Sequence, residues 1–215
     1  MSGAETLFSF RDVTLDSGGH RILDGVTMDI PAGGITALTG PSGSGKSTVL
    51  RCCNLLESPT SGRITYRGDD LVDADPLTLR RDVAMVFQRP TVFPGTALDN
   101  LRAGAPELTE DEAAALLAEV GLDAGMLHRE ADHFSGGEAQ RLCLVRALTT
   151  EPRVILADEV TSALDDEASA VLENLVSTVL TRQRGISVLW VSHSAEQVDR
   201  IADRVVRLDA GKVVA

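Results

Sequence analysis

The chain has 215 residues, of which 43% are apolar and 24% are charged, and its formal net charge at pH 7 is -12. This length and balance fit one globular domain with a full core. The acidic charge argues against a nucleic-acid partner, because phosphate contacts need clustered Lys and Arg. No apolar run approaches the roughly 20 residues that span a bilayer. Residues 1–11 lack the basic start and apolar centre of a signal peptide, so we expect an intracellular protein.

The first part of the chain has the pattern of short strands. Residues 7–38 alternate strand-like runs with glycine-rich turns, which predicts an antiparallel strand set. This set leads into a short buried strand at residues 34–39. Another short strand is predicted at residues 62–66, and a buried strand that ends on Gln88 is predicted at residues 83–88.

The pattern becomes helical from about residue 89 to residue 150. Thr109 with Glu112, and Ser135 with Glu138, form two capping boxes that each open a helix. We therefore expect a helical subdomain, inserted at about residues 89–150 between two strands of a sheet.

Sheet-type sequence resumes after this insertion. Residues 154–157 are a continuous apolar run, as in a central parallel strand. The helix that follows is predicted to bury one face, made of Val171, Leu172, Leu175 and Val179. A strand at residues 186–191, a short helix capped by Ser194 and a hairpin at residues 205–214 complete the chain. Strands that alternate with helices predict an α/β fold with a mostly parallel sheet and helices on both faces.

The most informative motif follows the strand at residues 34–39. It fits the phosphate-binding pattern G-x-x-x-x-G-K-[ST] without a mismatch and consists of Gly40, Pro41, Ser42, Gly43, Ser44, Gly45, Lys46 and Ser47. The glycines let successive N–H groups point at a polyphosphate, and the helix that begins here adds the positive end of its dipole. Lys46 offers a charge to the outer phosphates, and Ser47 offers a hydroxyl to Mg²⁺.

A glycine- and serine-rich surface loop would not explain a lysine placed between a strand and a helix. We therefore expect residues Gly40 to Thr48 to bind a nucleotide.

Two acids directly follow the apolar run at residues 154–157. Open α/β sheets place their ligand sites at the carboxyl ends of such strands. Asp158 can hold Mg²⁺ through its water shell, and Glu159 is then free to orient and polarise an attacking water. The alternative is a polar strand end that is only exposed to solvent.

Further segments resemble the motifs of ATP-binding cassette (ABC) ATPases. The run Phe134 to Arg141, FSGGEAQR, resembles the signature motif of that family. The other motifs follow in the family's order. Gln88 matches the Q-loop, residues 154–159 the Walker B strand, residues 162–165 the D-loop and His193 the switch histidine. The resemblance covers essentially the whole chain.

The resemblance implies one ABC ATPase domain, residues 1–215, with the P-loop NTPase fold and with ATP and Mg²⁺ as ligands. It implies a head-to-tail homodimer in the ATP-bound state, in which each ATP lies between one copy's phosphate loop and the other copy's signature motif. The residues that would contact ATP across that dimer are Ser135, Gly136, Gly137 and Glu138. The implied catalytic residues are Lys46, Gln88, Glu159 and His193, and the implied metal site is made of Ser47, Gln88 and Asp158.

The signature segment also has a purely local interpretation. In this interpretation, Ser135 and Glu138 only cap their own helix. The two interpretations are compatible, because the N–H groups of Gly136 and Gly137 remain available to a phosphate.

The sequence departs from the family pattern at the expected base-binding segment. Residues 15–20 contain no Phe, Tyr or Trp that would stack on adenine, and such stacking is worth roughly 1–3 kcal/mol. His20 can substitute only in part. Glu138 replaces the commoner Gln of the signature, and Val160 replaces the commoner Pro after the two acids.

The function that this resemblance implies is an ATPase subunit that powers a transporter. A separate integral membrane permease would supply the channel, and the subunit would lie peripherally on the cytoplasmic face of the membrane. A short helix of the permease would enter a groove beside the helical insertion, lined by residues 90–94. Ordinary loop packing explains those apolar residues equally well.

The cargo is less constrained. Residues 137–141, 158–166 and 188–193 look most like the FetA-type ATPase, which implies export of a metal, iron. ATPases of phosphate and amino-acid importers share nearly all of these motifs, so import stays open. A non-transport ABC ATPase that acts on nucleic acid or the ribosome is the other alternative, but the chain lacks the coiled-coil insertions, paired cassettes or basic surface usual in those relatives. A small-molecule kinase would leave the signature helix and His193 without a role.

Overall fold

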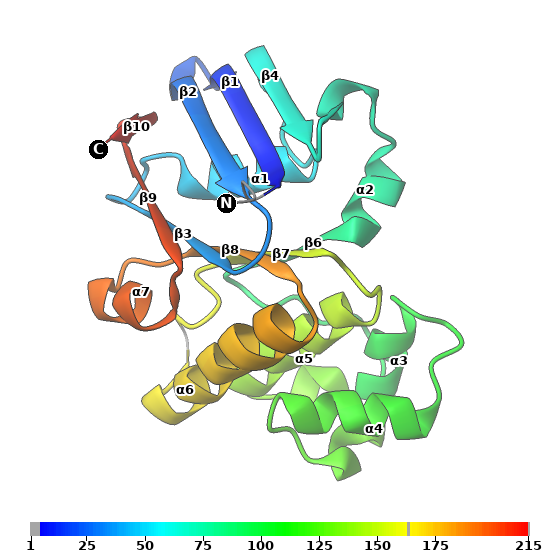
Figure 1. Ribbon diagram of the computed structural model, residues 1–215. Coiled ribbons are helices and arrows are strands. Elements are labelled where there is room, and N and C mark those ends of the chain that lie inside the picture. The colour runs from blue at the N-terminus through cyan, green and yellow to red at the C-terminus, as the bar shows by residue number, and fades with distance from the viewer. Residues whose placement is uncertain (1–4, 163, 215) are drawn as a thin grey trace.

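The computed structural model describes residues 5–162 and 164–214. Within these residues the chain forms two sheets with helices around them (Figure 1). The first sheet is antiparallel, in the order β2-β1-β4-β5. Its strands are β1 (Thr6–Ser17), β2 (His20–Pro31), β4 (Ser61–Tyr66) and β5 (Asp69–Asp70). The predicted antiparallel set is therefore confirmed.

The second sheet has the order β10-β9-β3-β8-β7-β6. Its strands are β3 (Ile35–Thr39), β6 (Val83–Val86), β7 (Val154–Asp158), β8 (Ser187–Val191), β9 (Arg204–Asp209) and β10 (Lys212–Val214). All pairs are parallel except β10 with β9. In register, Leu38 lies opposite Val191, and Val191 lies opposite Asp158. The carboxyl ends of β3, β8 and β7 therefore lie side by side, at the same end of the sheet.

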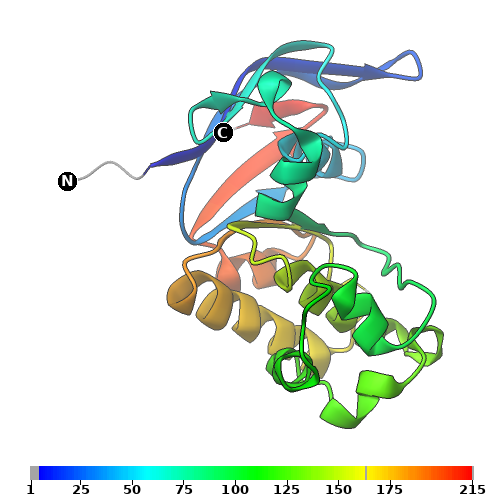
Figure 2. The same cartoon turned by 90° about the vertical axis from the view of Figure 1, so that its right-hand side faces the viewer.

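The helices lie on both faces of this sheet, as the alternating pattern predicts (Figures 1 and 2). They are α1 (Lys46–Cys53), η1 (Leu71–Asp73), α2 (Pro76–Asp82), α3 (Ala97–Arg102), α4 (Glu110–Glu119), η2 (Ala124–His128), η3 (Ala131–His133), α5 (Gly136–Leu148), α6 (Asp166–Asn174), η4 (Leu175–Gln183) and α7 (Ala195–Ile201). The elements from α3 to α5 fall between β6 and β7 and project to one side in Figure 2.

Two hydrophobic cores fill the spaces between these layers. Leu50 of α1 lies between the two sheets, where it belongs to one cluster with Phe10 of β1 and Leu23 of β2. On the other face of the large sheet, Leu142 of α5 belongs to the cluster that contains Trp190 of β8. Since both faces of β7 and β8 are covered, all of their residues are buried, which explains their continuous apolar sequence.

The predicted capping boxes are confirmed. The Thr109 side chain accepts from the Glu112 N–H, and the Glu112 carboxylate accepts from the Thr109 N–H over 3.0 Å, at the start of α4. Ser135 and Glu138 do the same at the start of α5. These reciprocal bonds satisfy N–H groups that the helix itself leaves without partners.

Three details of the sequence interpretation are wrong. The predicted strand at residues 83–88 ends at Val86, so Gln88 lies in the loop beyond it. The helical spacing of Val49, Leu50, Cys53 and Leu56 predicts one buried face after the phosphate loop, but Leu56 is 40% exposed because α1 ends at Cys53. In the long helix, Val171 is 37% exposed and Val179 only half-buried, whereas Leu172 and Leu175 are buried as predicted.

The second half of the long helix, η4, is a π-helix, whose i→i+5 hydrogen bonds widen each turn. In this half of the helix Val176 and Leu180 are buried in the core, and Val179 packs against that core with part of its side chain exposed.

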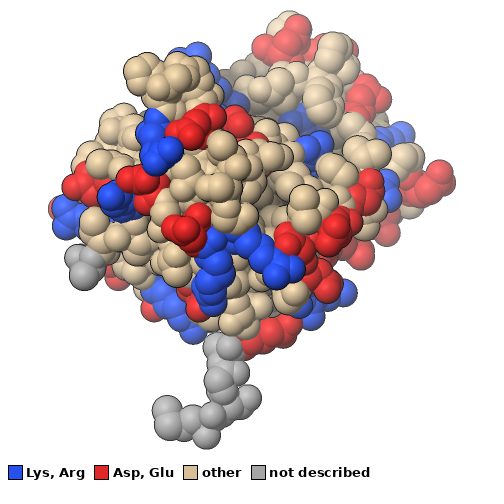
Figure 3. All heavy atoms as spheres, turned by 90° about the horizontal axis from the view of Figure 1, so that it is seen from above, with Lys and Arg blue, Asp and Glu red and all other residues tan. Residues whose placement is uncertain are grey.

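The surface carries both signs of charge. Figure 3, seen from the end of the molecule where β1, β2 and β4 lie, shows acidic and basic side chains interspersed. Across β1 and β2, for example, Arg11 Nη2 lies 2.8 Å from Asp29 Oδ1, and both side chains are half exposed. Exposed pairs of this kind add little to stability, and they neutralise the charge locally on this face.

Candidate functional site

The phosphate loop connects the carboxyl end of β3 to the start of α1. Gly40, Gly43 and Gly45 have φ values of +137°, +77° and +99°, a region that favours glycine. A Cβ on Gly40 would lie 1.9 Å from the Leu208 carbonyl oxygen, and a Cβ on Gly43 would meet nothing within 4 Å. The loop is therefore fixed against β9 on one side and open around Gly43 on the other.

Two neighbouring segments pack against the end of this loop. A Cβ on Gly45 would lie 3.1 Å from the Ile22 carbonyl oxygen of β2. The Gly211 N–H, in the turn between β9 and β10, donates to the Ser44 carbonyl over 3.2 Å. These tight backbone contacts fix the shape of the cradle without using its inward-facing N–H groups.

Lys46 lies inside the loop. Its Nζ donates to the carbonyl oxygens of Gly40 and Pro41 over 3.0 and 2.7 Å, and the residue is 5% exposed. Burial lowers the pKa of Lys46, and the carboxylates of Glu159 and Asp158 oppose that shift. The ammonium group is thus held in place next to the cradle, where it can meet a phosphate without a large rearrangement.

Ser47 and Asp158 make the contact that joins the loop to β7. Ser47 Oγ donates to Asp158 Oδ1 over 2.7 Å, although 111 residues separate them in the chain. Burial raises the pKa of Asp158, and the Ser47 hydroxyl opposes this rise. A hydroxyl beside a buried carboxylate is a donor set that suits Mg²⁺, which prefers oxygen ligands and keeps several of its waters. The residues present therefore fit this ion.

Glu159 is the centre of the second cluster. Its backbone has a φ of +49°, which is uncommon for a residue with a side chain and is found where the surrounding structure enforces it. Gln88 Nε2 donates to Glu159 Oε2 over 2.7 Å. His193 Nε2 pairs with the other carboxylate oxygen, Oε1. The structure thus brings Gln88, Glu159 and His193 together, from three separate segments of the chain.

The signature segment lies at the start of α5. The Ser135 hydroxyl accepts from the Glu138 N–H over 3.3 Å, and the Glu138 carboxylate accepts from the Ser135 N–H over 2.8 Å. The second of these bonds holds the pKa of Glu138 below its usual value. A Cβ on Gly136 would meet nothing within 4 Å, whereas one on Gly137 would lie 3.2 Å from Leu164. Ser135 is therefore used by its own helix, and Gly136 faces open space. Within the described residues, no hydrogen bond joins this segment to the phosphate loop.

Sequence reasoning missed a polar residue on the same helix. Gln140 is 1% exposed, and its Nε2 donates over 2.9 Å to the Phe87 carbonyl, directly before Gln88. This bond ties the signature helix to the loop that carries Gln88. A buried glutamine inside an otherwise apolar helix face was the available signal.

The segment that the sequence predicts to receive the base, residues 15–20, includes the end of β1, the turn after it and the start of β2. His20, the substitute that the sequence suggested, is exposed at the start of β2. Its neighbour Arg21 is held by two carboxylates, with Nε 3.0 Å from Asp16 Oδ1 and Nη1 3.3 Å from Asp24 Oδ1. How this segment receives adenine stays a prediction from the sequence.

A groove of about 600 Å³ lies between β6 and the helices that follow it. Pro90, Thr91 and Phe93 line it, as the sequence predicts, together with Leu77 of α2. Val92 turns away and packs against the helical core. The Arg146 guanidinium lies 4.1 Å from the centre of the Phe93 ring, which holds this ring at the groove wall.

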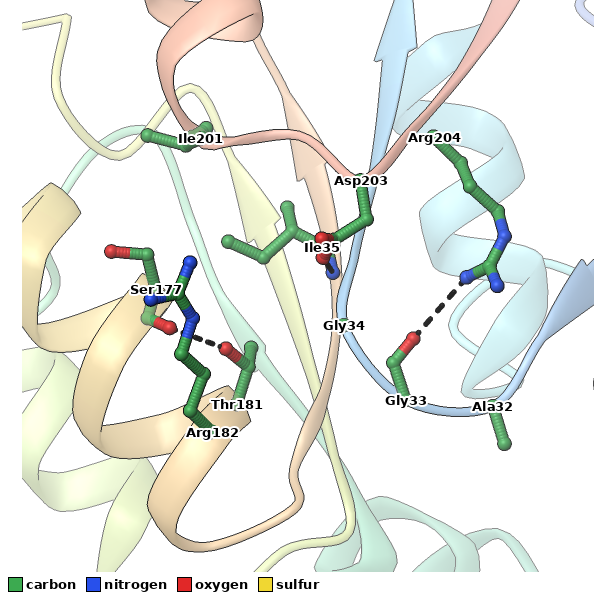
Figure 4. Close-up of a pocket in the computed structure, with 10 residues that line it drawn as sticks. All are labelled: Ala32, Gly33, Gly34, Ile35, Ser177, Thr181, Arg182, Ile201, Asp203 and Arg204. Carbon is green, nitrogen blue, oxygen red and sulfur yellow. Dashed lines mark hydrogen bonds between the residues drawn. The ribbon is translucent and has the colours of Figure 1, made fainter. Parts of the chain in front are cut away.

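Another cleft, of about 320 Å³, lies at the other end of the large sheet, where the parallel strands β3 and β9 begin (Figure 4). It surrounds Gly34, where β3 begins, and Asp203 Oδ2 accepts from the Ile35 N–H there over 2.7 Å. Arg182 and Arg204 lie on either side of it (Figure 4). Since the phosphate loop follows the carboxyl end of β3, none of the predicted site residues lines this cleft.

Comparison with known proteins identifies the class of protein. The ABC transporter family model matches residues 23–162. The chain is 42% identical over 219 residues to ABC transporter I family member 17 of Arabidopsis thaliana, covering all of this chain and 83% of that protein. It is 39% identical over 220 residues to the methionine import ATP-binding protein MetN of Caulobacter vibrioides, covering 97% of this chain and 66% of that protein. The chain thus spans less of the methionine relative than of the plant one.

A solved structure agrees with these sequence matches. The structure of cbiO1 from Clostridium perfringens, part of the ABC transporter complex cbiONQ, matches with a TM-score of 0.86 and 25% identity, over 98% of this chain and 88% of that one. The chain belongs to the ABC transporter family. It is an ATP-binding ATPase domain with the P-loop NTPase fold, as the sequence predicts. In the parts of the chain that the structure describes, no helix has the length and apolar content to cross a membrane.

The Ser47–Asp158 contact generates a prediction about the metal. Replacing Asp158 with Asn removes a negative charge beside Ser47, so the Mg²⁺ concentration for half-maximal ATP hydrolysis should rise about 10-fold or more. Titration of MgCl₂ at constant ATP measures this. Asp69→Asn, at an exposed carboxylate of β5, is the matched control. An unchanged Mg²⁺ requirement in the Asp158 variant would remove this residue from the metal site.

Proposed function

We propose that this chain is the ATP-hydrolysing subunit of a membrane transporter whose permease is a separate polypeptide. The observation that carries this proposal is that two clusters of polar side chains meet at the carboxyl end of one central strand. The Ser47–Asp158 contact and the Gln88–Glu159–His193 cluster both lie where β7 ends. The family membership supports the transport role, since the matched relatives include import ATP-binding proteins.

In the proposed mechanism, the residues Gly40 to Thr48 bind the phosphates of ATP. Backbone N–H groups and the start of α1 face the phosphates, and Lys46 leaves its loop carbonyls to pair with the outer ones. Ser47 and Asp158, with Gln88 nearby, would hold Mg²⁺, which when bound neutralises charge on the phosphates. One residue set thus binds and orients the substrate.

Glu159 is the proposed general base. Its carboxylate accepts from Gln88 on one oxygen and pairs with His193 on the other, so its orientation is fixed before substrate arrives. From this position it can take a proton from the attacking water. His193 and Lys46 would stabilise charge on the terminal phosphate, so that most of the catalysis is positioning and electrostatics.

The dimer is proposed from the signature segment. Gly136 and Gly137 present N–H groups at the start of α5, a helix of 13 residues whose dipole favours an anion there. Ser135 and Glu138 complete this corner. Because the corner faces open space at Gly136, a phosphate bound to a second copy can approach it. This supports a homodimer that closes on ATP and reopens after hydrolysis.

The permease is proposed to dock in the groove lined by Leu77, Pro90 and Phe93. Its walls combine apolar side chains with those of Arg80, Arg89 and Arg146, and they suit one short helix that projects from a membrane protein. Gln88 lies two residues before Pro90, so docking and the catalytic cluster share one loop. This arrangement would place the subunit on the cytoplasmic side of the membrane, as a peripheral protein.

The cargo proposal rests on sequence alone. Residues 137–141, 158–166 and 188–193 look like the FetA-type ATPase and favour export of iron. The likeness to a methionine import protein favours an amino-acid importer as the second candidate, and a phosphate importer stays open from the sequence. The mixed-sign surface in Figure 3 favours a permease over nucleic acid or the ribosome as partner.

Replacing Glu159 with Gln tests the hydrolysis step. The variant should bind ATP like the wild type, because Glu159 lies outside the phosphate loop, and its turnover should fall at least about 100-fold, as for loss of a general base. Phosphate release and nucleotide binding are measured in parallel. Glu107→Gln, at an exposed glutamate, is the control. Near-normal turnover of the Glu159 variant would contradict this role.

The dimer is tested at Gly136 in the Glu159→Gln background. Gly136→Asp should not disturb the fold, because a Cβ added at this position would meet no atom within 4 Å. A negative side chain at the start of a helix is also favourable. It should repel a partner's ATP and abolish the MgATP-dependent dimer seen by light scattering. Gly136→Ala, which adds no charge, should keep that dimer. If the Asp variant dimerises as well as the Ala variant, the corner does not face ATP.

Permease docking is tested at Leu77, which is 75% exposed and lines the groove. The chain should co-purify from native membranes with one membrane-spanning protein, and Leu77→Arg should lose it because a charge enters an apolar contact. Val72→Arg, at an 82% exposed residue that does not line the groove, is the control. Equal capture by both variants would exclude the groove. Transport of Fe²⁺, phosphate or methionine by the captured complex then identifies the cargo.

A further inference from the structure

A buried polar network surrounds the side chain of Gln197 on α7. Gln197 is 6% exposed. Its amide nitrogen donates to Thr161 Oγ1 over 2.9 Å and to Glu173 Oε1 over 2.8 Å. Its amide oxygen accepts from the indole N–H of Trp190 over 3.2 Å. The amide therefore has a partner for both N–H groups and for its oxygen.

The network joins segments that are far apart in the sequence. Thr161 lies in the loop after β7, Trp190 lies on β8 and Glu173 lies on α6. Arg200, also on α7, closes the network from outside, with Nε 3.1 Å and Nη2 3.0 Å from the two oxygens of Glu173. Buried polar groups are costly unless all are paired, so a fully paired set permits only one arrangement of these segments.

This network lies beside the catalytic cluster, close to the carboxyl ends of β7 and β8. Thr161 is two residues after Glu159, and Trp190 is three residues before His193. Gln197 itself is four residues after His193. The segment that carries His193 is thus held at its two ends, by Trp190 and by Gln197, and the same side chain holds the loop that carries Glu159.

The start of α7 does not require this side chain. The helix is capped by Ser194, whose hydroxyl accepts from the backbone N–H of Gln197 over 3.2 Å. A capping box would turn the side chain of Gln197 back to the N–H of Ser194. The side chain instead reaches Thr161 and Glu173, so the cap does not explain its position.

We propose that Gln197 is a positioning residue for ATP hydrolysis, which fixes the loop of Glu159 relative to the segment of His193. This inference rests on the proposed roles of Glu159 and His193. Within the described residues, the side chain of Gln197 makes no hydrogen bond to either of them or to the phosphate loop. Its effect is therefore on the alignment of the catalytic groups and not on the binding of ATP.

The first variant is Gln197→Glu, which keeps the shape of the side chain. Its carboxylate cannot donate to Thr161 or Glu173, and it places a second negative charge against Glu173. We expect kcat to fall about 10-fold, because both donated hydrogen bonds are lost and the loop of Glu159 is no longer fixed, with KM for ATP within about twofold of wild type. Gln183→Glu, at an exposed glutamine at the end of η4, is the matched control and should leave both constants unchanged.

The second variant exchanges the two groups. In the double variant Glu173→Gln with Gln197→Glu, the amide at position 173 can donate to the carboxylate at position 197, and Trp190 keeps its acceptor. We expect kcat to return to within about threefold of wild type, because the pairing is restored without the like-charge contact. Because the exchange would also repair a loss of stability, kcat is compared at a temperature where every variant is fully folded.

Trp190 provides a spectroscopic readout, since it is the one tryptophan in the sequence. Gln197→Met removes the acceptor of its buried indole N–H, so the emission should shift to shorter wavelength. In Gln197→Glu and in the exchange variant, the acceptor is kept and the emission should stay near that of wild type. Thermal unfolding of each variant shows whether it is folded under the conditions of the assay.

The outcomes separate the two proposals. If the Gln197→Glu and Gln183→Glu variants have the same kcat, the positioning role is overturned. It is also overturned if kcat, KM and the melting temperature all change together and the exchange variant does not recover. A wild-type chain that binds MgATP but never hydrolyses it, alone or with its permease, overturns the proposed function itself and the positioning role with it.

Discussion

The parallel pairing of β3, β8 and β7 is the constraint on which the site depends. Leu38 is level with Val191, and Val191 is level with Asp158, so three strands end at one edge. The phosphate loop, Glu159 and His193 follow these ends directly. A slip of one residue in this register would turn every side chain of the moved strand to the other face. The burial of all residues of β7 and β8 opposes such a slip, because both faces are packed.

Much of the site was predictable because it is local in the sequence. The phosphate loop, the two acids after β7 and the signature cap each lie within a few consecutive residues, and each has a pattern with a physical reason. Glu138 illustrates this. Although the resemblance suggests a different residue there, an acid at the third helical position accepts from the Ser135 N–H as a glutamine would. The cap therefore survives the substitution.

The parts that sequence reasoning missed are long-range. The partners of Gln197 lie 7, 24 and 36 residues away, and no periodicity connects them. Likewise, the bond from Gln140 to Phe87 spans 53 residues. The π-helical form of η4 was missed for another reason, since an apolar pattern does not reveal whether the backbone bonds run to the fourth or the fifth residue.

The close fit of Gly40 against Leu208 gives the end of the chain an unexpected importance. Gly40 of the phosphate loop packs against the Leu208 carbonyl of β9. The Gly211 N–H, in the turn that follows β9, donates to the Ser44 carbonyl. The hairpin of β9 and β10 therefore supports the phosphate loop through backbone contacts. Whatever displaces this hairpin, whether a fused tag, an added module or a neighbouring subunit, also deforms the grip on the nucleotide. The substitutions that this hairpin tolerates are therefore limited by its contacts with the phosphate loop, although the two segments are far apart in the sequence.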